Sequence, residues 1–293
     1  MNKANNKILY FLVVAVILLS AIAAGIGVFY NGNGEPHNFI NQYGDTVKVY
    51  GQGIYEYDSF NKGPLFRGTD FAILFFGIPV FIFALIFDIK KQTLKARIFL
   101  VSMLFSFAYY SASLAFGVTY NKLFLVYLLL FSASLFGLIV SFLSINMKSV
   151  SENVKGKLPY KGIYVFMLFV AIFLFIAWLP DIIQSLLNNR SLALIEVYTT
   201  EITYIIDMGI LVPIAIACIV LLKKRNGLGY VLFEAMLVLC LLIGVVLTFQ
   251  SVFQIKAGVE IPLPQLITKA GIFYALTALA IPLIVKLNKS IKY

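Results

Sequence analysis

The chain has 293 residues, of which 61% are hydrophobic, 15% aromatic and only 12% charged, whereas soluble domains carry about 25% charged residues. Together with a mean hydropathy of +0.94, this composition leaves too little polar surface for a water-soluble globule and excludes a soluble enzyme, a secreted domain and a disordered chain. The net charge of +10 is read first as a signal of membrane topology and not as a nucleic-acid-binding surface.

Eight stretches meet the length of about 20 mostly apolar residues that a helix needs to cross a bilayer. They cover residues 8–34, 71–87, 98–121, 123–147, 162–180, 203–222, 235–253 and 264–285. The sixth contains Asp207 and the eighth contains Lys269, and the seventh is expected to begin near Gly227, which places Glu234 inside it. We therefore predict an all-α bundle of about eight transmembrane helices that forms a single membrane domain.

The first apolar stretch also has features of a secretory signal peptide, because Lys3 and Lys7 precede it and Ala21-Ile22-Ala23 mimics a cleavage site. Its apolar run continues through Val28, which exceeds the roughly 7–15 residues of a signal-peptide core. We expect an uncleaved helix over residues 1–30. Cleavage would leave seven spans and an outside N-terminus.

Charge in the connecting segments predicts the orientation. Lysine and arginine gather in the two termini and near residues 90–97, 148–161 and 223–225, whereas most acids lie in the alternate loops. Because cytoplasmic loops are enriched in basic residues, both termini are expected in the cytoplasm and the protein in a bacterial plasma membrane.

Residues 31–68 form the predicted extracytoplasmic loop, followed by a seven-helix bundle over residues 69–293. Two β-prone runs, 46–50 and 54–58, flank Gly51-Gln52-Gly53 and predict a hairpin folded over the outer ends of the helices. The loop has two interpretations: a lid that packs on the bundle, or a recognition element. The candidate recognition residues are Tyr50, Tyr55 and Tyr57.

The second outer connection spans residues 181–202. Pro180 is expected to end the fifth helix, and Asp181 to cap a new short helix on the outer leaflet. The sequence also has a weak four-plus-four symmetry. Pro79 and Pro213 lie in the helices that follow the longest outer loop of each half, and both helices end at a dibasic pair. These features raise the hypothesis of two parallel four-helix repeats.

Asp207 and Lys269 are each predicted about one turn inside the outer edge of their helices. A charge at the centre of a membrane helix costs about 2.5–3.5 kcal/mol on insertion scales, so we predict that these two residues pair near the outer face. The pair has two interpretations: an ion or proton relay (or a counter-ion for a headgroup), or a structural ion pair that locks two helices together.

Glu234 is predicted about two turns from the cytoplasmic end of the seventh helix, facing the bundle, where a basic residue of 223–225 can approach it. Thr69 and Asp70 suit the N-terminal cap of the second helix, whereas Arg67 is expected to meet an anionic headgroup or an outer acid. The candidate intramembrane polar site consists of Asp207, Lys269, Glu234 and Arg67.

Small polar residues recur at helical spacing on two helices. The third helix carries Ser102, Ser106, Tyr109 and Ser113, and the fourth carries Ser134, Gly137, Ser141 and Ser144. Such stripes let membrane helices approach closely and hydrogen-bond, so packing is the first interpretation and a hydrophilic groove the second.

The motifs that would indicate chemistry are missing. The one histidine is His37, Cys218 and Cys240 are predicted at depths too different for a disulfide, and the sequence has no P-loop and no Gly-x-Ser-x-Gly elbow. No cofactor, no metal site and no catalytic residue is predicted, which disfavours an enzyme.

Four short motifs carry a resemblance. The run DMGILVP at 207–213, the triplet Lys223-Lys224-Arg225, Gly229-Tyr230 and Arg67-Gly68-Thr69-Asp70 together resemble a family of uncharacterised bacterial multi-pass membrane proteins. The resemblance covers most of the chain after the first helix. It implies a location in the bacterial cell membrane, and because that family has no established activity it implies no substrate.

Charge inside a membrane is costly unless it is used or paired, so the leading functional hypothesis is that the bundle binds or transports a small molecule or a lipid. The alternative is a non-transporting sensor or scaffold whose outer loop meets a membrane partner protein, and the third is a lipid-modifying enzyme. The bilayer itself is an expected partner and nucleic acid is not. A polar cavity joining Asp207 to one membrane face would favour transport.

Overall fold

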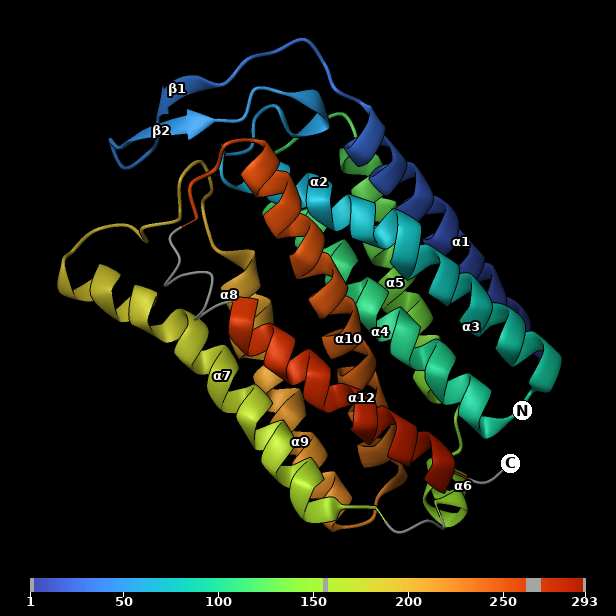
Figure 1. Ribbon diagram of the computed structural model, residues 1–293. Coiled ribbons are helices and arrows are strands. Elements are labelled where there is room, and N and C mark those ends of the chain that lie inside the picture. The colour runs from blue at the N-terminus through green and yellow to red at the C-terminus, as the bar shows by residue number, and fades with distance from the viewer. Residues whose placement is uncertain (1–2, 155–157, 262–269, 292–293) are drawn as a thin grey trace.

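The computed structural model describes residues 3–154, 158–261 and 270–291, with side chains from Asn6 onward. In these ranges, eight helical segments are long and apolar enough to cross a membrane. The predicted all-α membrane bundle with a small hairpin-containing loop is therefore confirmed. Figure 1 shows the hairpin at one end of the bundle and both chain termini toward the other. We call these the hairpin end and the basic end, the latter carrying Lys90, Lys91, Lys223 and Lys224.

Some spans are single helices and two are composite. The single-helix spans are α1 (Lys3–Phe29), α4 (Leu94–Gly117), α5 (Phe124–Leu143), α7 (Tyr160–Leu187), α10 (Gly227–Lys256) and α12 (Ile272–Ser290). One composite span joins α2 (Lys62–Ala72), the π-helical turn η2 (Ile73–Gly77) and α3 (Ile78–Lys91). The other joins α8 (Ile202–Ile206), the π-helical turn η3 (Asp207–Leu211) and α9 (Val212–Lys223). The short helix α6 (Met147–Asn153) lies at the basic end.

The two π-helical turns have the same physical cause. Pro79 and Pro213 are each the second residue of the α-helix that follows a turn. Proline cannot donate to the carbonyl four residues earlier, and its ring clashes with that carbonyl. In the two spans that carbonyl belongs to Phe75 and to Gly209, which lie inside η2 and η3. The wider π turn accommodates the ring in both spans, so the two halves share this feature as well as their dibasic ends.

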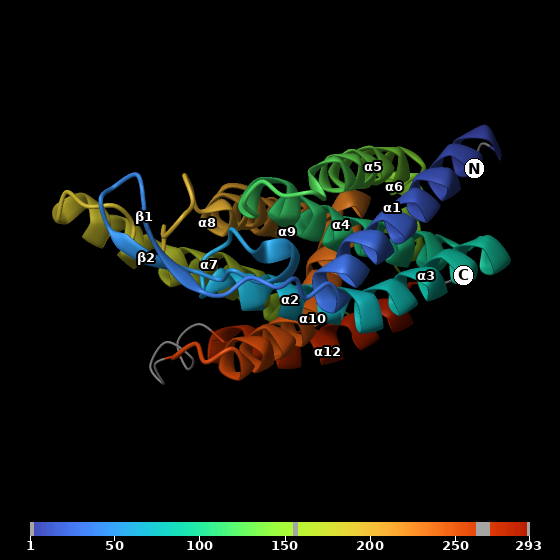
Figure 2. The ribbon, with the colours of Figure 1, turned by 90° about the horizontal axis from the view of Figure 1, so that it is seen from above.

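Helix α10 is the centre of the bundle and packs against α2, α4, α9 and α12. Seen from above, α4 and α10 lie between α5 on one side and α12 on the other (Figure 2). One buried apolar cluster is formed mainly by α1 to α5, and a second by α7, α9, α10 and α12 together with part of α4. Helices α2 and α10 approach closely at Gly68, where an added Cβ would lie 2.5 Å from the Phe249 carbonyl oxygen of α10.

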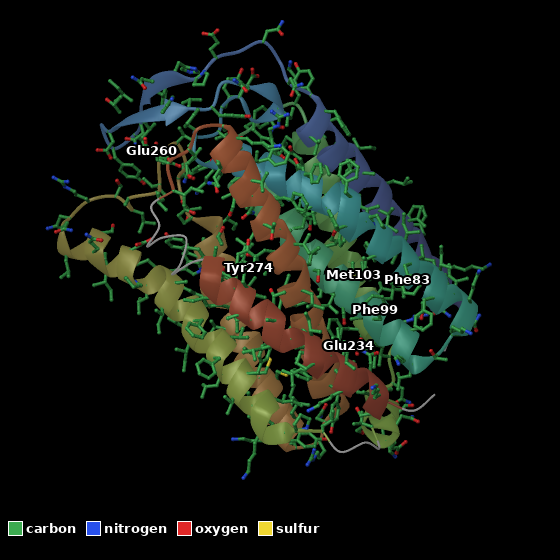
Figure 3. All side chains as sticks on the ribbon, viewed as in Figure 1. Phe83, Phe99, Met103, Glu234, Glu260 and Tyr274 are labelled. Atoms are coloured by element: carbon green, nitrogen blue, oxygen red, sulfur yellow. The ribbon has the colours of Figure 1, made fainter. Side chains whose placement is uncertain are left out.

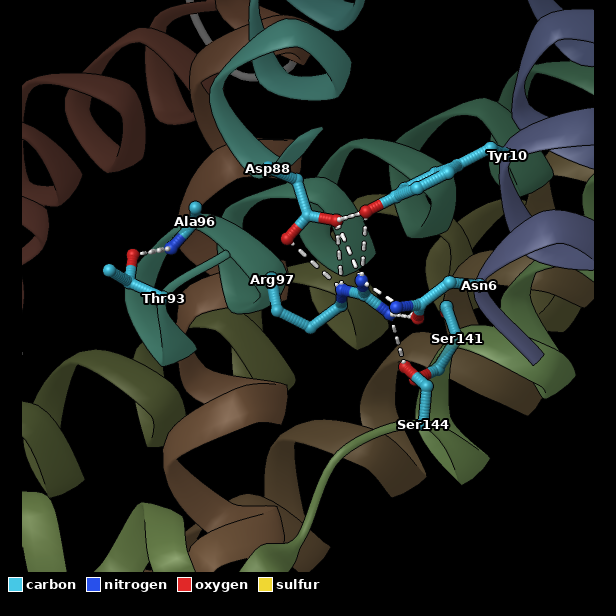
Figure 4. A network of polar contacts seen from close by, with 8 residues as sticks. All are labelled: Asn6, Tyr10, Asp88, Thr93, Ala96, Arg97, Ser141 and Ser144. Carbon is cyan, nitrogen blue, oxygen red and sulfur yellow. Dashed lines mark hydrogen bonds and ion pairs between the residues drawn. The ribbon is translucent and has the colours of Figure 1, made fainter. Parts of the chain in front are cut away.

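A buried ion pair joins four elements near the basic end (Figure 4). Arg97 of α4 lies 2.8 Å from Asp88 of α3, and both side chains are almost fully buried. The Tyr10 hydroxyl of α1 donates to Asp88 at 2.9 Å, and Arg97 donates to Asn6 of α1 and to Ser144 after α5. These bonds satisfy the charges without water, so the network fixes how the four elements meet. Neither Asp88 nor Arg97 stands out in the sequence, because both lie at the edges of predicted spans.

Several local predictions are wrong. The hairpin pairs β1 (His37–Ile40) with β2 (Thr46–Val49) in antiparallel register, and the expected second strand instead contains the short 3₁₀ helix η1 (Gly53–Tyr55). A turn over residues 41–45, closed by the bond from Asn41 N–H to the Asp45 carbonyl at 2.9 Å, allows this upstream pairing. All four residues of β1 are exposed, and only Val49 of β2 is buried. The hairpin is therefore not folded flat on the helices.

Two helix ends also differ from expectation. Helix α7 continues through Pro180 to Leu187, and Asp181 is not a cap but accepts from the Tyr204 hydroxyl at 2.8 Å. Helix α2 begins at Lys62, so Thr69 and Asp70 lie inside it. Pro64 is tolerated there because the first helical turn has no partner for its N–H group.

Gly68 should not accept a side chain. In Gly68→Ala the new methyl group meets backbone atoms of Phe249 and Gln250 that cannot move away independently. We expect a loss of about 1–3 kcal/mol, the usual cost of overpacking, measured by unfolding in detergent. The matched control is Gly25→Ala on α1, where the added Cβ has open space. Equal stability of the two variants would contradict the close contact.

The Arg97–Asp88 pair should behave as a unit. Removing one member of a buried pair leaves an uncompensated charge and costs about 3–5 kcal/mol, so Arg97→Leu should be strongly destabilising. Adding Asp88→Leu should recover part of that loss, which a double-mutant cycle in detergent measures. Lys90→Leu, at an exposed position on α3, is the control. Strictly additive losses would show that the two charges are not coupled.

Candidate functional site

A cavity of about 430 Å³ lies in the half of the bundle nearer the hairpin end, enclosed by residues of α2, α4, α7, α10, α12 and the α8–η3 segment. Its volume falls within the usual range for small-molecule pockets, about 300–1,000 Å³. Most of its wall is apolar, with Leu242, Ile243 and Val246 of α10 facing Ile73 of η2 and Phe273 of α12. The polar lining includes Lys62, Tyr109, Trp178, Glu201, Asp207 and Gln250.

The deep end of the cavity is built around Asp207. This carboxylate is 1% exposed, and its two oxygens accept from the Tyr109 hydroxyl of α4 at 3.0 Å and from the Trp178 indole N–H of α7 at 2.9 Å. The Trp178 ring stacks on Tyr204 of α8, with ring centroids 4.6 Å apart. Three separate elements thus hold one carboxylate among aromatic rings, inside a membrane span.

The mouth of the cavity lies at the level of the loops. Lys62, the first residue of α2, forms an ion pair with Glu201, directly before α8. Gln254 of α10 donates to the side chain and the carbonyl oxygen of Asn61 at 2.9 and 3.0 Å. Glu260 also lines the mouth and lies toward the hairpin end in Figure 3. The cavity therefore extends from Asp207 within the span to charged residues of the loops.

The two loops at the hairpin end, residues 31–61 and 188–201, pack on each other and form what we call the loop cap. Asn41 and Gln42 donate to the Glu196 and Tyr198 carbonyl oxygens at 2.9 and 2.7 Å, and Ser59 donates to the Glu196 carboxylate. Asp58 is fully buried in the cap and accepts from the Tyr198 hydroxyl at 2.9 Å. It also accepts from the Thr119 N–H between α4 and α5, at 3.0 Å. The cap thus holds the segment before α8 over the cavity mouth.

A second buried carboxylate, Asp70, does not itself line the cavity. Asp70 of α2 is fully buried and accepts from the hydroxyls of Tyr55 in the loop and Tyr110 of α4. Gly27 of α1 lies so close that an added Cβ would be 1.7 Å from the Asp70 carboxylate. Arg67 binds the Val28 carbonyl and the Asn31 side chain at 2.8 and 2.7 Å. This cluster fixes the end of α1 and the start of the loop to α2.

The structure separates the residues that the sequence grouped as one polar site. Asp207 lies in the cavity and Arg67 lies in the contact between α1 and α2. Lys269 lies outside the described residues, so its predicted pairing with Asp207 stays a prediction. Glu234 is fully buried on α10 toward the basic end (Figure 3). Neither of its carboxylate oxygens makes a hydrogen bond of ordinary geometry among the described residues, and its polar neighbours are Lys95 and Asn288.

Two members of the basic triplet expected near Glu234 lie over aromatic rings of α7, Arg225 over Tyr160 at 3.3 Å and Lys223 over Tyr164 at 5.9 Å. Of the candidate recognition tyrosines, Tyr50 and Tyr55 are buried and Tyr57 is 58% exposed. Tyr50 accepts from Arg67 at 3.2 Å, so these two buried rings serve the packing of the loop.

Sequence reasoning missed most of the cavity. The sequence placed three of its polar residues, Lys62, Trp178 and Glu201, in loops or at helix ends. Their partners are distant in the sequence: Trp178 contacts Asp207, 29 residues away, and Lys62 contacts Glu201, 139 residues away. The stripe on the third predicted helix was the usable signal, because Ser106, Tyr109 and Ser113 line the cavity. Because the wall of this cavity is mostly apolar, the hydrophilic groove stays a prediction. The stripe on α5 packs instead, with Ser134 and Ser141 fully buried.

Within the described ranges, no group of three or more histidine, cysteine, aspartate or glutamate side chains could hold a metal ion. The chain matches no family model, no curated protein and no solved structure. The resemblance drawn from the short motifs therefore stays a hypothesis.

Asp58 should make the stability of the loop cap depend on pH. Burial raises the pKa of this carboxyl from 3.8 to about 7, although bonds from Thr119 and Tyr198 and the charge of Lys62 partly oppose the shift. Because the folded state holds this proton more tightly than the unfolded state, the contribution to stability falls as pH rises from 3.8 to about 7.

Thermal unfolding in detergent over that interval should therefore show a lower melting temperature at the upper end, and Asp58→Asn should flatten the slope. Asp45→Asn, at an exposed position of the same loop, should leave the slope unchanged. A slope that Asp58→Asn does not alter would assign it to other groups.

Proposed function

We propose that this multi-pass membrane protein binds a small molecule in the cavity and moves it through the helix bundle. The observation that carries the proposal is the continuity of the cavity from Asp207, inside a span, to Glu201 and Glu260 at the hairpin end. A buried carboxylate in a membrane span is costly and marks functional sites by default. A lining that joins it to one face gives a ligand an entry route.

The proposal includes an orientation. The basic end carries Lys90, Lys91, Lys223 and Lys224, and positive charge favours the cytoplasmic side. We propose that the hairpin end faces the outside of a bacterial plasma membrane, so the ligand enters from the exterior.

Two features support movement of the ligand in addition to binding. The turn η3 begins at Asp207 itself, and η2 contributes Ile73 to the cavity wall. Single π turns interrupt the regular hydrogen-bond ladder and occur often at functional sites, and they are among the known places where helices bend. Packed apolar side chains and the Arg97–Asp88 pair close the half of the bundle at the basic end. This closed half is the barrier that would open after the ligand has entered from the hairpin end.

A sensor is the second candidate, and one observation favours it. Phe39, Ile40 and Tyr43 on the hairpin are each at least half exposed, and the loop cap they belong to lies over the cavity mouth. A partner protein on the hairpin would then be coupled to ligand binding through Asn41 and Gln42. This role uses the same cavity without movement of the ligand across the membrane.

Cysteine accessibility tests the entry route. In a background with Cys218→Ala and Cys240→Ala, Ser113→Cys and Ser251→Cys place thiols on the cavity wall. Membrane-impermeant methanethiosulfonates, cationic or anionic, should modify both positions when applied to intact cells. Ser134→Cys, fully buried on α5 and outside the cavity lining, should stay unmodified. The proposal fails if no reagent reaches the cavity thiols from outside, or if they react only in inverted vesicles.

A further inference from the structure

The ligand class can be argued from the charge and the aromatic content of the cavity, on the basis of the proposed function. Among the described lining residues, four are acids (Glu196, Glu201, Asp207 and Glu260) and Lys62 is the only cation. Lys62 is already paired with Glu201. An anionic ligand would therefore meet an excess of negative charge with no uncommitted cation on the described wall, whereas a cation would be attracted from the mouth inward.

The deep end of the cavity offers a partner for a positive charge. Each Asp207 oxygen accepts one protein hydrogen bond, and a carboxylate has about four acceptor positions. The Tyr109 and Trp178 donors hold the carboxylate in place and leave acceptor positions for a ligand. Trp178 and Tyr204, stacked on each other, also line the cavity beside it, and aromatic rings attract organic cations within about 6 Å of the ring centroid.

The rest of the wall selects an apolar body. Leu242, Ile243, Val246 and Leu247 follow one side of α10 along the cavity, and they gain from burying hydrocarbon but cannot replace the hydration shell of a small metal ion. A bare metal cation is therefore disfavoured, and an ammonium group attached to apolar carbon fits both the deep end and the wall.

We propose that the cavity binds an organic ammonium cation, with its charged group at Asp207 among Tyr109, Trp178 and Tyr204 and its apolar part against α10. The ammonium group can belong to a free amine or to the headgroup of a lipid, since the chemistry that Asp207 recognises is the same.

The single tryptophan of the chain provides the measurement, because Trp178 is both the only tryptophan and a direct partner of Asp207. The full chain in nanodiscs of phosphatidylglycerol is titrated with benzyltrimethylammonium, with its uncharged carbon isostere neopentylbenzene and with the anion benzylsulfonate. The affinity read from the Trp178 fluorescence should be at least about tenfold higher for the cation than for either analogue, which corresponds to about 1.4 kcal/mol. Equal affinities, or no response to millimolar cation, would overturn the proposal.

Asp207→Asn tests the assigned residue, because its Oδ1 can accept from the Trp178 indole N–H while its NH2 group donates to the Tyr109 hydroxyl oxygen. It should weaken binding of the cation by about tenfold and leave the isostere unaffected. Glu152→Gln, an exposed charge change at the basic end, is the matched control and should bind as the unaltered protein does. Unchanged cation affinity in Asp207→Asn would overturn the assignment. If the melting curve shows that this variant does not fold, Tyr204→Leu replaces it and should also weaken binding of the cation but not of the isostere.

A second, independent arm uses the labelling rates at Ser113→Cys. Trimethylammonioethyl methanethiosulfonate should react faster than sulfonatoethyl methanethiosulfonate, after correction for their rates with a free thiol. Equal corrected rates would overturn the ammonium proposal while the proposed cavity route stands, whereas no labelling by either reagent would end both. Finally, the cation is titrated in phosphatidylglycerol and in phosphatidylcholine nanodiscs at high salt, which screens its attraction to the anionic bilayer. Weaker binding in phosphatidylcholine then assigns the headgroup as the natural source, and equal binding assigns a free amine.

Discussion

The structure depends on one constraint, which is that a carboxylate removed from water must find hydrogen-bond donors within the protein. Five of the six aspartates meet it in the same way, through a tyrosine hydroxyl. The pairs are Asp58–Tyr198, Asp70–Tyr55 and Asp70–Tyr110, Asp88–Tyr10, Asp181–Tyr204 and Asp207–Tyr109. Tyrosine suits this task because its ring packs among apolar side chains while its hydroxyl reaches a polar partner. Each pair joins different elements, so the set fixes how helices and loops meet.

Helix α4 links two of these carboxylates. Tyr109 and Tyr110 are adjacent in sequence and therefore point about 100° apart around the helix, one toward Asp207 and the other toward Asp70. The cavity and the contact between α1, α2 and the loop thus share one rigid element. Any rotation of α4 that changes the bond to Asp207 also changes the bond to Asp70, which in turn holds Tyr55 of the loop cap, so α4 connects the cavity with the loop cap.

Properties that depend on neighbouring residues were predictable from the sequence, and those that depend on distant pairs were not. Hydropathy is local, so all eight spans were found. Two helix ends were wrong: α7 tolerates Pro180 and continues beyond it, and α2 begins in the loop well before Thr69. The strand at residues 46–49 was found, but its partner was assigned downstream instead of upstream. The partners of Asp207 are 29 and 98 residues away, and no spacing rule identifies such pairs. Asp207 itself was identified because a charge in an apolar stretch is visible without its partners.

Two buried glutamates differ from the aspartates among the described residues: Glu201 pairs with Lys62, and Glu234 has Lys95 and Asn288 as its polar neighbours. Glu234 lies five residues, or about 7.5 Å along α10, from Leu239, which lines the cavity. Asp70 and Asp88 are committed to tyrosine and arginine partners in the other half of the bundle, whereas Glu234 has no geometric hydrogen bond among the described residues. Helix α10 thus contributes the apolar wall of the cavity on one stretch and, five residues from Leu239, a fully buried carboxylate with Lys95 and Asn288 beside it.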